Sequence, residues 1–338
     1  MKPVGSRTAK PLRIAVLAGG DSDERDVSLS SGESVAKALA QRGHLVSRVD
    51  PADGPLCSHN WDDIDVAFLA LHGKFGEDGH VQGILEEIGV PYTGSNADAS
   101  RLAFSKSASK ERFLQFEVPT PPYVLIHESD DPSRIEKHAR KIGYPLVVKP
   151  DAQGSSIGVS IVHSPSELSD ALATCFAFDK FGLIEACVVG SEWTLGLIDD
   201  QPLPLIQIET GRLFFDFHAK YEDNATQYQF EFALESNIIR AIENAGVRAA
   251  QSLGTSGIAR VDIRVDRQNR PWVLEVNTIP GFTDHSLVPK AAARIGWSLG
   301  ELCEKAIQSC LPKPEAVPTG RRTLRTPNSR TQNTQTSR

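Results

Sequence analysis

Strand and helix patterns alternate in the first third of the chain, and this alternation limits the fold more than any other feature. Short apolar runs at Ile14–Ala18 and Asp65–Leu71 are typical of buried strands, and His44–Val49 is a further predicted strand. Helical patterns cover Val27–Gln41 and His80–Ile88. Strands joined by helices form a parallel sheet under covering helices, so we expect an α/β fold that begins with a βαβ, Rossmann-like domain.

The remaining two thirds show a mixed α+β pattern. Ser133–Ile142 and Ser236–Leu253 are predicted helices, and Ile258–Val265 and Trp272–Val276 are predicted to form a strand pair. Capping boxes at Ser164–Glu167 and Ser298–Glu301 are expected to start two more helices, the first with proline at its first helical position. Further strands are predicted at Pro145–Lys149, Val159–Val162, Leu183–Val188, Glu192–Leu197, Leu203–Ile208 and Phe214–Phe217.

Composition and charge exclude several classes of protein. The net charge is −7, but residues 313–338 carry six basic side chains against Glu315, which leaves −12 for the rest. An acidic body argues against nucleic acid as a partner. No apolar run is long enough to span a membrane, and Ile14–Gly20 fits a first strand better than a signal peptide. The five cysteines form no CxxC pair, which predicts buried thiols in a reducing cytoplasm, without zinc or disulfides.

A glycine-rich loop follows the predicted strand that ends at Lys149. Its sequence from Gln153 to Gly158 contains two glycines and two serines, and no P-loop motif occurs anywhere in the chain. Glycines let backbone N–H groups approach an anion, hydroxyls add donors, and the lysine adds a positive charge. The pattern indicates a phosphate-binding loop, although an ordinary hairpin loop would have a similar composition.

Oxygen ligands gather on the predicted strand pair. Asp262 lies on one strand, and Glu275 and Asn277 lie on the other, two residues apart and therefore on one face. Such a set suits Mg²⁺, which usually keeps waters and shares nucleotide phosphates; the alternative is a solvated acidic surface. Arg260 shares the face of Asp262 and could stabilise a developing oxyanion. Gly281 follows Pro280, where it is either a second oxyanion donor or a turn glycine.

These residues, in this order, resemble the ATP-grasp superfamily and, more narrowly, the D-alanine–D-alanine ligase family. The resemblance extends from Arg13 to about Leu311. It rests on motifs at Gly19–Ser28, Leu71–Gly79, Pro91–Ser95, Lys149–Ser160, Ala219–Tyr221, Gly257–Asp262 and Glu275–Pro289. The resemblance implies ATP-dependent joining of two D-alanine molecules through an acyl phosphate, for peptidoglycan synthesis. It also implies two Mg²⁺ ions held by Asp262, Glu275 and Asn277, with Mn²⁺ as a substitute.

The resemblance also implies a role for each motif residue. Lys106 and Lys149 would hold ATP phosphates, Glu185 and Glu192 would bind adenine and ribose, and Lys220 would cover the phosphates from a mobile loop. The full nucleotide set is Lys106, Lys149, Ser155, Ser156, Glu185, Glu192, Phe214, Lys220 and Leu274. Ala186 and Cys187 depart from the residues that usually follow the glutamate in the family, which leaves the adenine contacts open.

The two D-alanine sites are implied in the same way. Glu24 would receive the first ammonium group, with His72 as a positioning residue at the end of a buried strand. Ser286 and the Leu287 backbone would receive the second carboxylate. Arg260 and the Gly281 N–H would form the oxyanion hole, and Glu24, Ser155 and Tyr221 would form a hydrogen-bonded catalytic set. Tyr221 favours a dipeptide former over a D-lactate-using ligase.

The predicted organisation combines both lines of reasoning. We expect a flexible N-terminus (1–12), a βαβ substrate domain (13–108), a central ATP-grasp subdomain (109–197), a C-terminal subdomain with the metal and oxyanion sites (198–312) and a disordered basic tail (313–338). The family is commonly dimeric, so the resemblance implies a homodimer, but the residues themselves give no interface signal. Two alternatives remain: a related ligase that uses D-lactate or D-serine as acceptor, and a catalytically silent binding protein.

Overall fold

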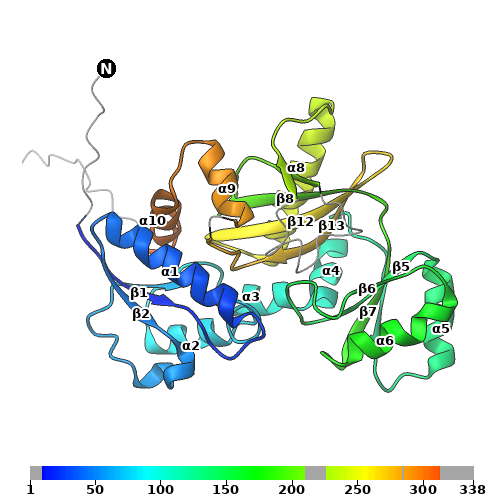
Figure 1. Ribbon diagram of the computed structural model, residues 1–338, viewed down its shortest axis with the longest axis horizontal. Coiled ribbons are helices and arrows are strands. Elements are labelled where there is room, and N and C mark those ends of the chain that lie inside the picture. Colours follow the sequence, from blue (N-terminus) through cyan, green and yellow to red (C-terminus); the bar gives the residue numbers. More distant parts are fainter. Residues whose placement is uncertain (1–9, 210–225, 284, 313–338) are drawn as a thin grey trace, which may run out of the picture.

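A three-stranded parallel sheet forms the N-terminal part of the computed structural model, which describes residues 10–209, 226–283 and 285–312. Its order is β2 (Leu45–Val49), β1 (Arg13–Leu17) and β3 (Val66–Leu69). Helix α1 (Arg25–Gln41) connects β1 to β2, helix α2 (His80–Ile88) follows β3, and both helices pack on the sheet (Figure 1). All residues of the run from Ile14 to Leu17 are fully buried. The predicted βαβ arrangement is therefore confirmed.

Two helices that the sequence patterns did not predict lead out of this sheet. They are α3 (Ala97–Phe104) and α4 (Lys106–Gln115). Side-chain caps start both, because Asn96 accepts from Ala99 N–H and Ser105 accepts from Ala108 N–H. Helix α4 is strongly polar, and its buried residues include Lys106 and Lys110. Its sequence therefore lacks the apolar period on which helix prediction depends.

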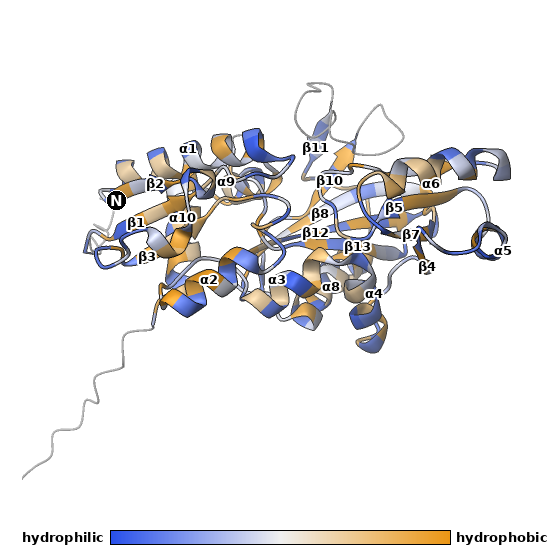
Figure 2. Cartoon of the chain, turned by 90° about the horizontal axis from the view of Figure 1, so that it is seen from below, coloured by the Kyte–Doolittle hydropathy of each residue, from blue (hydrophilic) through white to orange (hydrophobic). Residues whose placement is uncertain are grey.

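The central part is a four-stranded antiparallel sheet with the order β4 (Tyr123–His127), β7 (Phe181–Ala186), β5 (Leu146–Pro150) and β6 (Ser160–Val162). Helices α5 (Pro132–Ile142) and α6 (Leu168–Phe176) share an apolar core with it. In Figure 2 the outer helix α5 is mostly hydrophilic, whereas the strands beside it are largely hydrophobic. Strand β4 was not predicted.

The two predicted capping boxes have different outcomes. At Ser298 both bonds are present, and α10 (Leu299–Cys310) begins there as predicted. At Ser164 the prediction was wrong, because the N–H of Glu167 donates to the backbone carbonyl of Ser164 in a 3-10 turn. The Ser164 hydroxyl instead donates to the Glu167 carboxylate, and the α-helix starts only at Leu168.

The C-terminal part is a larger antiparallel sheet with the order β11 (Gln227–Gln229), β10 (Ile206–Glu209), β8 (Gly190–Ile198), β12 (Ile258–Asp266) and β13 (Pro271–Asn277), with β9 (Gln201–Pro202) beside β8. Helix α8 (Ser236–Leu253) packs on it, with the bounds that the sequence predicted. The predicted pairing of β12 with β13 is confirmed. Helices α9 (Leu287–Arg294) and α10 then return to the N-terminal sheet and complete its core (Figure 1).

Other sequence predictions can be compared with the described residues. All five cysteines are free; Cys175 and Cys303 are buried, but Cys57 is exposed, contrary to the prediction of buried thiols. No helix in the described part of the chain is long and apolar enough to cross a membrane. The predicted strand at Phe214–Phe217 and the predicted tail at 313–338 lie outside the described residues. The domain divisions remain predictions, and those at 108/109 and 197/198 fall inside α4 and β8.

Candidate active site

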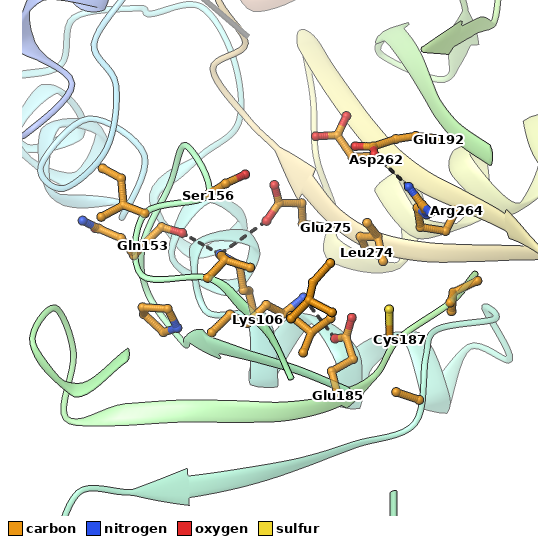
Figure 3. Close-up of a pocket in the computed structure, with 18 residues that line it drawn as sticks. Lys106, Gln153, Ser156, Glu185, Cys187, Glu192, Asp262, Arg264, Leu274 and Glu275 are labelled. Atoms are coloured by element: carbon orange, nitrogen blue, oxygen red, sulfur yellow. Dashed lines mark hydrogen bonds and ion pairs between the residues drawn. The ribbon is translucent and has the colours of Figure 1, made fainter. Parts of the chain in front are cut away.

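A cavity lies between the central sheet and the C-terminal sheet (Figure 3). The central sheet contributes residues of β5, β6 and β7, and the C-terminal sheet contributes residues of β8, β12 and β13. The lining brings together eight predicted site residues: Lys106, Lys149, Ser156, Glu185, Glu192, Leu274, Asp262 and Glu275. The predicted phosphate-binding lysine and two of the three predicted metal ligands, Asp262 and Glu275, therefore face one space.

One end of this cavity is apolar. Val147, Ile161 and Ala186 line it from the central sheet, Leu274 lines it from β13, and Val188 lines it from the segment after β7. A slot with aliphatic walls and a few polar groups fits a planar heterocyclic base. Ala186 leaves this end roomier than a large side chain would.

Two lysines stand at the polar part of the cavity. The Lys149 ammonium lies 3.1 Å from Glu185 Oε2, at the end of β5. Lys106, in the first turn of α4, donates to the Gln153 carbonyl at 2.6 Å and lies 3.3 Å from Glu275 Oε2. Both ammonium groups are largely buried, so their charges act through little solvent.

The glycine-rich loop reaches from the cavity to the N-terminal domain. Ser155 and Ser156 have positive φ values of 49° and 59°, and Ile157 N–H donates to the Gly154 carbonyl at 3.1 Å. These features define a tight turn of type I′. The Ser155 hydroxyl donates to Glu24, so the structure joins Ser155 to the predicted substrate residue, while Ser156 lines the cavity.

The predicted metal ligands adjoin one another on β12 and β13. Asp262 is paired with Glu275 across the two strands, and Arg260 is paired with Asn277. Arg260 binds both carboxylate oxygens of Asp262 at 2.9 Å, and the Asn277 amide donates to Asp262 at 3.2 Å. The predicted convergence of Arg260 with Asp262 is therefore present in the structure.

A β-bulge shapes this face. Asp262 pairs with Glu275, but the next residue, Ile263, pairs with Val273, so Leu274 is the extra residue on β13. As a result Leu274 and Glu275 both line the cavity, although simple alternation would place them on opposite faces. A regular strand was expected here, so the sequence pattern missed the bulge.

The donor chemistry fits a hard divalent cation. Two carboxylates and one amide oxygen beside a phosphate-sized cavity are suitable ligands for Mg²⁺, with phosphate oxygens and waters supplying the rest. Among the described residues, no cluster of three or more histidine, cysteine, aspartate or glutamate side chains could hold a metal alone.

Glu24 lies in a narrow gap between two glycines. A Cβ on Gly73 would lie 2.8 Å from Glu24 Oε2, and one on Gly154 would lie 2.6 Å from the same atom. Only glycine permits this approach at either position. A second pocket, lined by the segments 20–24 and 73–75 and by Gln153, opens beside this carboxylate.

His72 and the loop that precedes α9 meet through Ser31. The Ser31 hydroxyl lies 3.2 Å from His72 Nε2 and accepts from Phe282 N–H at 3.3 Å. Burial, with the positive charge of Arg260, lowers the pKa of His72 to about 4, so the ring is neutral at pH 7. A Cβ on Gly281 would lie 2.7 Å from Ser286 Oγ, which brings these two predicted residues together next to Leu287.

Five residues with positions in or beside the site were given no role from the sequence. Glu77 faces the carboxylates of Glu24 and Glu275, and burial together with Glu24 raises its pKa. Arg264 binds Glu192 at 3.0 Å. The others are Ser31, Thr194 and Lys110. Only Lys110 had a usable signal, because it follows Lys106 by four residues and would share its helix face. Three predicted residues, Phe214, Lys220 and Tyr221, lie outside the described residues.

Family models match most of the chain. The model described as "D-ala D-ala ligase C-terminus" matches residues 113–308, and "D-ala D-ala ligase N-terminus" matches residues 48–95. A D-alanine–D-alanine ligase of Syntrophotalea carbinolica is 41% identical over 296 residues, which cover 87% of this chain and 95% of that protein.

Solved structures of ligases also resemble this chain. The D-alanine–D-alanine ligase of Bacillus anthracis is 37% identical, with a TM-score of 0.79 over 88% of this chain and 97% of that chain. Its structure complexed with ATP gives a TM-score of 0.76, at 33% identity over 88% of this chain and 97% of that chain. The VanG D-Ala:D-Ser ligase of Enterococcus faecalis is 26% identical, with a TM-score of 0.78 over 89% of this chain and 100% of that chain.

Proposed function

The chain belongs to the D-alanine–D-alanine ligase family, and from this premise we propose how its own residues join two D-alanine molecules with conversion of ATP to ADP and phosphate. The observation that carries the proposal is the single cavity that Lys149 and Lys106 share with Asp262 and Glu275, next to an apolar slot. Cations for phosphates, oxygen ligands for a divalent ion and a base-sized slot are the parts that an ATP-dependent ligase needs.

The layout of the cavity supports one mode of nucleotide binding. The adenine ring enters the apolar end, beside Glu185 and Ala186, and Glu192 accepts from the ribose. Lys149 and Lys106 hold phosphate oxygens as point charges. Asp262, Glu275 and Asn277 would hold Mg²⁺, which supplies positive charge at the transferred phosphoryl group when it is bound.

The first D-alanine binds on the other side of the glycine-rich loop. Glu24 receives its ammonium group, and neutral His72 orients it without transferring a proton. One carboxylate oxygen of this D-alanine then attacks the γ-phosphorus of ATP. The bond from that phosphorus to the ADP oxygen breaks, which gives a D-alanyl phosphate and ADP.

The second D-alanine is held by its carboxylate at Ser286 and the Leu287 N–H, at the N-terminus of α9. Its amine, once deprotonated, attacks the carbonyl carbon of the acyl phosphate. Arg260 and the Gly281 N–H stabilise the tetrahedral oxyanion, a contribution of roughly 10²–10³ in rate per donor. Collapse of this intermediate releases phosphate and D-alanyl-D-alanine.

The test is phosphate release from ATP in the presence of Mg²⁺ and D-alanine, together with detection of the dipeptide. A Lys149→Met variant serves as the negative control. Release above a blank without amino acid is expected, and no release above that blank would eliminate the proposal. Release that requires D-serine or D-lactate as acceptor would instead favour the related ligases, to which the likeness to a D-Ala:D-Ser ligase gives some weight. The homodimer and the cytoplasmic location remain predictions.

A further inference from the structure

We propose that Lys110 is a positioning residue that neutralises Glu185, so that Lys149 can turn to the nucleotide phosphates. The inference rests on the proposed function in one respect, because it takes the cavity to be the ATP site. Lys110 itself would touch no part of the nucleotide. It would act through the carboxylate that it shares with Lys149.

The geometry shows two cations on one carboxylate oxygen. Lys110 Nζ lies 2.8 Å from Glu185 Oε2, and Lys149 Nζ lies 3.1 Å from the same atom. Two ammonium groups and one carboxylate leave a net charge of +1 at this point. The surplus charge is most available to a phosphate when one of the lysines turns away from Glu185.

Burial determines which lysine is able to leave. The Lys110 side chain has 0% exposure and does not line the cavity, whereas Lys149 is 8% exposed and does. Lys110 also has fixed partners, since it donates to Thr120 Oγ1 at 2.6 Å and to the Pro121 carbonyl at 3.3 Å. Lys110 is therefore the permanent partner of Glu185, and Lys149 is the exchangeable one.

The partners of Lys110 compete little for its charge. Thr120 and Pro121 are neutral acceptors, and Thr120 is itself fixed by donating to the Val273 carbonyl of β13 at 2.9 Å. The Tyr123 ring lies 5.3 Å from the Lys110 ammonium and adds a cation–π contact. Burial lowers the pKa of Lys110 to about 8, with Glu185 opposing this effect, so most of its charge persists at pH 7.

Removing the Lys110 charge should keep Lys149 on Glu185. A buried carboxylate with no other counterion holds its remaining cation strongly. Phosphates would then have to compete for Lys149, while the base and ribose contacts stay in place. A charge-assisted hydrogen bond of this kind corresponds to roughly 10- to 100-fold in affinity.

The experiment compares the dissociation constants of ADP, with Mg²⁺, and of adenosine, measured by displacement calorimetry on the full chain. Lys110→Met is expected to weaken ADP roughly 10- to 100-fold and to change adenosine by less than about twofold. Lys141→Met, at an exposed lysine in the last turn of α5, is the matched control and should change neither ligand. A merely structural role for Lys110 would weaken ADP and adenosine equally, and that result would overturn the proposal, as would unchanged ADP affinity.

A second background isolates the link through Glu185. In Glu185→Gln the carboxylate that holds Lys149 is gone, so adding Lys110→Met should leave the ratio of the ADP and adenosine constants unchanged. A ratio that changes as much as in the wild-type background would contradict the proposal.

Should Lys110→Met alone fail to fold, the double variant can be compared with Glu185→Gln, and Thr120→Val with the wild type. The double variant and Glu185→Gln should have the same ratio of ADP to adenosine dissociation constants, and Thr120→Val should weaken the binding of ADP but not of adenosine. A different ratio in the double variant, or equal effects of Thr120→Val on both ligands, would overturn the proposal. Failure of the proposed function would be seen elsewhere, as absence of D-alanine-dependent phosphate release by the wild-type protein.

Discussion

Thr194→Val tests the metal site through a residue that would not touch the metal. The Thr194 hydroxyl donates to Asp262 Oδ1 at 2.8 Å from the neighbouring strand β8, and Thr194 is 1% exposed. Valine keeps the shape and removes only the donor. A hydrogen bond to a charged acceptor contributes about 1.5–3 kcal/mol when solvent cannot replace it. Since about 1.4 kcal/mol is tenfold, the carboxylate should bind Mg²⁺ roughly 10- to 100-fold more weakly.

The assay is phosphate release at fixed ATP and D-alanine, with Mg²⁺ varied above the ATP concentration. The half-saturating Mg²⁺ concentration should rise by the factor above, while the rate at saturating Mg²⁺ changes only a few-fold, because Arg260 and Asn277 still orient Asp262. Thr174→Val, at an exposed helical threonine of α6, is the control. An unchanged Mg²⁺ dependence in Thr194→Val would refute the reasoning.

Three further substitutions test other parts of the site. Glu275→Gln should lower Mg²⁺-dependent turnover steeply in a folded protein, because an amide is a poorer ligand for a hard cation; near-normal activity with an unchanged Mg²⁺ requirement would remove Glu275 from the site. Gly154→Ala should lower kcat/KM for D-alanine by about 5- to 100-fold, because its Cβ would lie 2.6 Å from Glu24 Oε2. The control Gly83→Ala has open space around its Cβ and should leave kcat/KM unchanged, so equal values for both variants would count against the position of Glu24. The pKa of His72 falls from 6.5 to about 4 on folding, so the unfolded chain binds the extra proton, and the free energy of unfolding should fall by about 3 kcal/mol as the pH drops from 6.5 to 4. In denaturant titrations His72→Gln should lack this pH dependence, and a pH profile identical to that of the wild type would contradict it.

The sequence predicted the elements whose patterns are local. Ser236–Leu253 has a strong amphipathic period, and its predicted bounds match those of α8. Ser298 begins α10 with the predicted capping box. By contrast, α4 buries Lys106 and Lys110, so its buried face is charged and no apolar period marks it. Ser164 failed as a capping residue because a backbone bond had already taken the N–H of Glu167.

Site residues that belong to a sequence motif were predictable, whereas residues that contact them only through strand pairing were not. Asp262 and Glu275 were found from the sequence, but Thr194 comes from β8, and only the register of β8 against β12 places its hydroxyl on Asp262. The bulge at Leu274 depends in the same way on the pairing of β13 with β12. The spacing of four residues from Lys106 could have pointed to Lys110, but its contact with Glu185 joins distant segments and only the fold provides it.

The most direct test of the account uses D-alanine labelled with ¹⁸O in both carboxylate oxygens. In the proposed reaction one of these oxygens attacks the γ-phosphorus and later leaves with the phosphate when the amine displaces it. Mass spectrometry of the released phosphate should therefore find one ¹⁸O per phosphate, in equal amount to the D-alanyl-D-alanine formed. Dipeptide formed together with unlabelled phosphate would contradict phosphorylation of the D-alanine carboxylate in the cavity of Lys149, Asp262 and Glu275.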